Sequence, residues 1–156
     1  MEPYRGIAAV AAAQVLCFFL LTFLEPRFVM IHLYQSIVYI SLLVMLYFRE
    51  DRWAYMIGVL TSGVWLTLVC LSPVMRNAIR GLREVRTSDA VTLSVSALAI
   101  TTAMFALLMM ALCGRHWKKE YSGLGMGGKT FLVSLGIVVL YYGILVHWFW
   151  EMIPAS

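Results

Sequence analysis

Five stretches of the chain are apolar over the length that a membrane-spanning helix needs. A hydrocarbon core about 30 Å thick is crossed by about 20 helical residues. Lys, Arg, Asp and Glu are absent from all five stretches. The pattern therefore predicts an all-α, polytopic membrane protein in which a bundle of five transmembrane helices with short loops forms one domain over residues 1–156. The predicted spans are residues 7–24, 28–48, 53–73, 90–113 and 130–150.

The connection between the third and fourth spans predicts a further, shorter helix over residues 75–86. Apolar residues recur there at helical spacing, and arginines recur on another face. Such a helix lies at a membrane surface, where its cations contact lipid phosphates; docking of an acidic partner is the alternative. Ser88 or Asp89 is placed to cap the fourth span. The basic residues assigned to the membrane surface or a partner are Arg76, Arg80, Arg83, Arg86, Lys118 and Lys119.

Composition supports the membrane assignment. Hydrophobic residues make up 62% of the chain, charged residues make up 13%, and the mean hydropathy is +0.86. A soluble domain is closer to half apolar and a quarter charged. These values exclude a soluble enzyme, a disordered tail and a disulfide-stapled secreted module. The net charge of +4 comes from short connections between apolar runs, which indicates contact with membrane lipids and not with nucleic acid.

The distribution of basic residues predicts the orientation of the chain. Five crossings place the two termini on opposite sides of the membrane. The side with more Lys and Arg tends to be cytoplasmic, so we expect the N-terminus in the cytoplasm and the C-terminus outside. The N-terminal side holds seven (Arg5, Arg49, Arg52, Arg115, Lys118, Lys119, Lys129) and the other side holds five (Arg27, Arg76, Arg80, Arg83, Arg86).

A glycine-rich segment at Gly123–Thr130 matches the spacing of a phosphate-binding loop. That loop functions between a buried strand and a soluble helix, whose amides converge on the phosphates. Here a basic, aromatic segment precedes it and an apolar span follows it. We therefore predict a flexible connection that binds no nucleotide.

Two histidines within the apolar spans are the strongest candidates for chemistry, because ionisable groups inside a membrane are costly. His32 lies about one turn into the second span, and His147 lies about one turn before the end of the fifth. Counting spans places both at the same membrane face. Glu25, which ends the first span, and Glu151, four residues after His147, are predicted to lie at that face too.

Three interpretations of these residues stay open. The histidines could hydrogen-bond neighbouring helices. His32 and His147 could be the axial ligands of one b-type haem, which needs two imidazoles at equal depth. Alternatively, Glu25, His32, His147 and Glu151 could bind a metal ion or relay protons.

The function expected from these features is that of a non-catalytic integral membrane subunit and not that of an enzyme. It would pack against other integral subunits and stabilise a larger complex. An electron-transfer subunit with one haem is the first alternative. The second is a small transporter or lipid-handling protein, which would need a cavity lined by Gln14, Gln35 and Tyr39. No catalytic residue is predicted.

Overall fold

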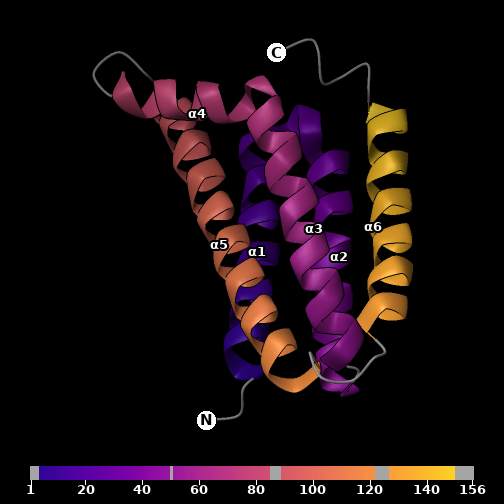
Figure 1. The fold of residues 1–156 in the computed structure, drawn as a ribbon. Coiled ribbons are helices and arrows are strands. Elements are labelled where there is room, and N and C mark those ends of the chain that lie inside the picture. Colours follow the sequence, from indigo (N-terminus) through magenta and orange to yellow (C-terminus); the bar gives the residue numbers. More distant parts are fainter. Residues whose placement is uncertain (1–3, 50, 85–88, 122–126, 150–156) are drawn as a thin grey trace.

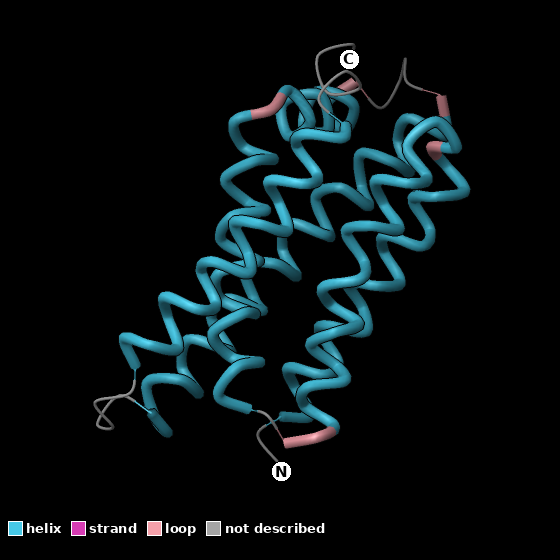
Figure 2. Tube along the Cα trace, turned by 90° about the vertical axis from the view of Figure 1, so that its right-hand side faces the viewer, coloured by secondary structure: helices cyan, strands magenta, loops and turns pink. Residues whose placement is uncertain are grey.

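The structure is a computed structural model that describes residues 4–49, 51–84, 89–121 and 127–149. Helices account for nearly all of these residues (Figure 2). Long helices α1, α2, α3, α5 and α6 run alternately up and down between the two ends of a bundle (Figure 1). In chain order the elements are α1 (Tyr4–Leu24), a 3-10 turn (Pro26–Phe28), α2 (Val29–Tyr47), α3 (Asp51–Leu71), α4 (Pro73–Arg83), α5 (Ala90–Tyr121) and α6 (Gly127–Phe149).

The five long helices confirm the all-helical fold and lie along the five apolar stretches of the sequence. Each is long and apolar enough to cross a membrane. The main difference is α5, which continues past the predicted end at residue 113 to Tyr121. In its polar extension, His116 Nδ1 lies 3.5 Å from Glu120 Oε1 one turn later, and side chains at this spacing are neighbours on one side of a helix. Lys118 and Lys119 also favour a helix C-terminus.

The predicted short helix is α4, which lies across one end of the bundle (Figure 1). It spans Pro73–Arg83, whereas residues 75–86 were expected; residues 85 and 86 lie outside the described part of the chain. Pro73 occupies the first turn, where its missing N–H breaks no helical hydrogen bond. Ala78 and Gly81 are buried, and Gly81 approaches Ser96 of α5 so closely that a Cβ there would overlap the serine hydroxyl.

The core lies among α1, α2, α3 and α5, whose largest interfaces are those of α3 with α5 and of α1 with α2. Phe18 stands at its centre, with its ring centroid 5.9 Å from that of Tyr39 and 6.0 Å from that of Trp65. By contrast, α6 lies at the periphery. It packs mainly on α3 and touches α2 at few points.

Two tyrosines connect α6 to α2. The rings of Tyr34 and Tyr141 are stacked with centroids 4.5 Å apart. The Tyr34 hydroxyl donates to the Tyr141 carbonyl over 3.0 Å, and the Tyr141 hydroxyl donates to the Tyr34 carbonyl. Because each hydroxyl has a protein acceptor, this contact satisfies its own polar groups, as an apolar environment requires.

Asp89, one of the two residues predicted to cap the fourth span, caps the start of α5. The other, Ser88, lies outside the described residues. The Asp89 carboxylate accepts a hydrogen bond from Thr92 Oγ1 over 2.6 Å, and its carbonyl accepts one from Leu93 N over 3.1 Å. The Thr92 hydroxyl, followed by amides of the first turn, holds the pKa of the Asp89 carboxyl below its ordinary value.

The lowered pKa predicts an acid-sensitive contribution of Asp89 to stability. The ionised cap stabilises the fold above the unfolded pKa of about 3.9, and this contribution is lost as the pH falls through the lower folded pKa. Asp89→Asn should therefore melt below the unmodified protein at pH 7, and the difference should shrink as the pH is lowered below about 4, in thermal unfolding in mild detergent. A difference that does not change with pH would contradict the cap's role.

Candidate functional site

Glu25 and His32 form a close pair at the junction of α1 and α2. The 3-10 turn between them folds the chain back, so that Glu25 Oε2 lies 3.3 Å from His32 Nε2. His32 is buried, with an exposed fraction of 9%, and lies on the same buried side of α2 as Ser36 and Tyr39. The two atoms are within ion-pair distance but are not aligned for a hydrogen bond. The pair therefore attracts when the imidazole is protonated and the carboxylate is ionised.

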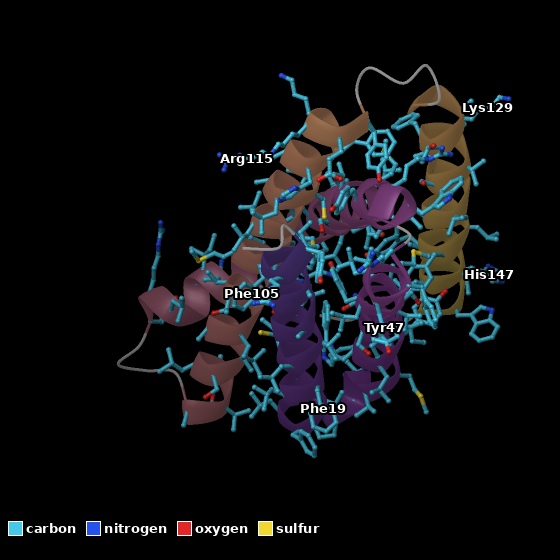
Figure 3. The ribbon with its side chains drawn as sticks, turned by 90° about the horizontal axis from the view of Figure 1, so that it is seen from below. Phe19, Tyr47, Phe105, Arg115, Lys129 and His147 are labelled. Carbon is cyan, nitrogen blue, oxygen red and sulfur yellow. The ribbon has the colours of Figure 1, made fainter. Side chains whose placement is uncertain are left out.

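His147 lies near the end of α6, at the same end of the bundle as the start of α2 that carries His32 (Figure 1). Its side chain is exposed on the outer side of α6 (Figure 3). It lines an open groove of about 720 Å³ between α3 and α6. Val64 and Leu68 form the α3 wall, and Gly143 belongs to the α6 wall.

Of the four predicted ligands, the structure brings Glu25 and His32 together. His147 lines a groove that His32 does not line, and Glu151 lies outside the described residues. A haem held by two imidazoles requires both rings to face one cavity. Within the described residues, no three His, Cys, Asp or Glu side chains are arranged to hold a metal ion. The haem and metal assignments stay predictions that this geometry does not support.

The outer face of α6 carries an exposed stripe that lies away from the buried face of this helix and borders the groove toward α3 at Gly143 and His147. The stripe consists of Gly136, Leu140, Gly143 and His147, which are all exposed. They recur at helical spacing and so share one side of the helix. A Cβ added at Gly136 or Gly143 would meet no atom within 4 Å. The buried face of α6 consists of Thr130, Ser134, Val138, Tyr142 and Leu145.

A layer of buried polar side chains crosses the middle of the bundle, and sequence reasoning did not identify it as a layer. Gln14, Tyr39, Ser62 and Thr102 come from α1, α2, α3 and α5, and each is 0% exposed. Gln14 Nε2 donates to the Thr102 carbonyl over 3.3 Å. The available signal was a polar residue near the midpoint of each of these four helices.

This layer also bears on the transporter alternative. A cavity lined by Gln14 and Tyr39 would leave accessible surface on both side chains, but both are 0% exposed. Among the described residues, the structure therefore leaves no water-sized space against Gln14 or Tyr39. Gln35, the third expected lining residue, is partly exposed.

The predicted basic residues lie at both ends of the bundle. Arg76, Arg80 and Arg83 are exposed on α4, and Lys118 and Lys119 are exposed near the opposite end, in the last turn of α5. Arg86 lies outside the described residues.

In the glycine-rich segment Gly123–Thr130, residues 123–126 also lie outside the described part. Residues 127–130 form the first turn of α6, and the helix that precedes the glycine-rich segment is α5.

No protein-family model, curated protein or solved structure matches this chain.

Proposed function

We propose that the protein is a non-catalytic, multi-pass integral membrane subunit that packs through the outer face of α6 against a transmembrane helix of a larger complex. The single observation that carries this proposal is the exposed Gly136–Leu140–Gly143–His147 stripe, which lies away from the buried face of α6.

The composition of the stripe favours a helix over lipid as its neighbour. Small residues at membrane helix faces allow two backbones to approach closely. An imidazole facing hydrocarbon is unfavourable, whereas a partner helix can offer it a hydrogen-bond acceptor. The two open glycine positions leave space for such an approach, because no atom of this chain occupies it.

The membrane arrangement is part of the same proposal. Five apolar helices give five crossings, and the larger number of basic residues on the N-terminal side supports a cytoplasmic N-terminus. Labelling of single cysteines added at each end, from outside intact cells, tests this orientation.

The Gly136→Leu, Gly143→Leu double variant tests the packing proposal. A Cβ at either position would meet no atom of the chain within 4 Å, and both positions are exposed, so the isolated protein should stay folded and monodisperse in mild detergent. The leucine side chains should hold the partner helix away from α6. The recovery of co-purifying membrane subunits should then fall by about tenfold or more, since a loss of 1.4 kcal/mol is a tenfold change in affinity.

The matched control is Ile137→Phe with Ile144→Phe. These residues are exposed on α6 but lie to one side of the stripe. Their enlargement should leave co-purification unchanged. Equal losses in both variants, or full recovery in the glycine variant, would contradict the assignment of the stripe.

A further inference from the structure

We infer that the arginine-bearing face of α4 binds the headgroups of anionic phospholipids in one leaflet. This surface, called the α4 arginine face below, consists of Arg76, Arg80 and Arg83. It is distinct from the stripe on α6, and the inference does not depend on the partner proposed there.

The side chains of α4 are sharply divided by character. Arg76, Arg80 and Arg83 recur at spacings of four and three and so lie on one side of the helix. Met75, Ala78 and Leu82 lie on the other side, with Ala78 buried and the other two partly buried. A helix of this kind lies in the plane of a membrane interface, with its cations toward the phosphates.

The bundle fixes α4 at the depth where headgroups lie. It crosses the end of the bundle directly after α3, one of the helices long enough to span a membrane (Figure 1). Close contact of Gly81 with Ser96 of α5 holds one side of α4 against the bundle. Val74 and Ile79, exposed at 46% and 42%, flank the buried side of α4, where acyl chains would cover them.

The charge of this face fits phosphate. All three residues are exposed, and among the described carboxylates none forms an ion pair with them. The nearby Asp89 carboxylate is engaged by Thr92 at the cap of α5. Arginine presents a planar fork of donors that matches phosphate oxygens. Arg76 and Arg83 are separated by about 10 Å along the helix at 1.5 Å per residue, so the face presents its donors as a row and not at one point.

The test uses the full chain, delipidated in mild detergent and offered equal amounts of phosphatidylglycerol and phosphatidylcholine with the same acyl chains. Native mass spectrometry measures the ratio of the two bound lipids. The unmodified protein should prefer phosphatidylglycerol. Because a basic residue near an anionic surface is worth about fivefold in affinity, Arg76→Gln, Arg80→Gln, Arg83→Gln should reduce this preference by about tenfold or more.

The control removes the same number of charges from exposed residues at the opposite end of the bundle, by Arg49→Gln, Arg115→Gln, Lys129→Gln. It should keep most of the preference. Equal losses in the two variants would show that net charge and not α4 selects the lipid, and would overturn the inference. An unmodified protein without preference would overturn it too. The inference would also be overturned if added inorganic phosphate abolished the preference and chloride of equal ionic strength did not, because the site would then bind the free anion. Unchanged helical circular dichroism confirms that both variants are folded.

Discussion

Replacing Gly58 by alanine should destabilise the bundle by about 1–3 kcal/mol, the usual cost of adding a methyl group to a filled core. Gly58 lies in α3, which forms its largest interface with α5. A Cβ there would stand 2.7 Å from Cys113 Sγ, closer than real Cβ atoms come to a neighbour. Cys113 is fully buried and cannot turn away into open space. The two helices must therefore separate locally, and the unfolding free energy in mixed detergent micelles measures the cost.

A second substitution makes this prediction specific. Cys113→Ala removes the sulfur atom and leaves the Cys113 Cβ 3.6 Å from the added methyl group, an ordinary contact. In the double variant, Gly58→Ala should therefore cost much less than it does alone, giving a coupling energy within the range of about 0.5–3 kcal/mol found for residues in contact.

Gly63→Ala is the matched control in the same helix. Its nearest neighbour would be Met110 Sδ at 3.8 Å, so the substitution should be neutral or stabilising by up to about 1 kcal/mol through helix propensity. Equal effects at the two glycines, or no rescue by Cys113→Ala, would contradict the close packing of α3 on α5.

Much of the fold followed from apolar length. The five long helices lie where runs without Lys, Arg, Asp or Glu predicted them, because a run of about 20 apolar residues satisfies its backbone most simply as one helix. The α4 helix was predicted from its two faces, since apolar and basic positions alternate there with helical period. The extension of α5 to Tyr121 was missed because its residues are polar.

The candidate site was only partly predictable. Counting spans shows how deep a residue lies in the membrane, but not whether its side chain faces the bundle or the outside. His32 and His147 lie at the same end of the bundle, yet His32 is buried and His147 is exposed. Both faces of α6 are apolar, so its sequence pattern does not show which face packs on α3. That choice is made by tertiary packing: Ser134, Val138 and Leu145 face inward.

Tyr39→Ala should be among the most destabilising substitutions in the chain, by about 3–5 kcal/mol, as for other large aromatic side chains removed from a core. Tyr39 is 0% exposed at the centre of α2 and contacts the ring of Phe18. Its removal leaves a cavity that helices from several directions would have to close, and tightly packed interiors relax only in part. Reversible unfolding in mixed micelles measures the loss.

Tyr39→Phe separates the contribution of the ring from that of the hydroxyl. The hydroxyl lies beside Gln14 and Ser62 but has no aligned hydrogen bond. Removing it deletes a poorly satisfied buried group, so the change should stay within about 1 kcal/mol. Tyr47→Ala is the matched control on the same helix, because Tyr47 is 82% exposed and its removal should change the unfolding free energy by about 0.5 kcal/mol or less. If Tyr39→Phe cost nearly as much as Tyr39→Ala, the polar layer and not aromatic packing would hold the centre of the bundle together.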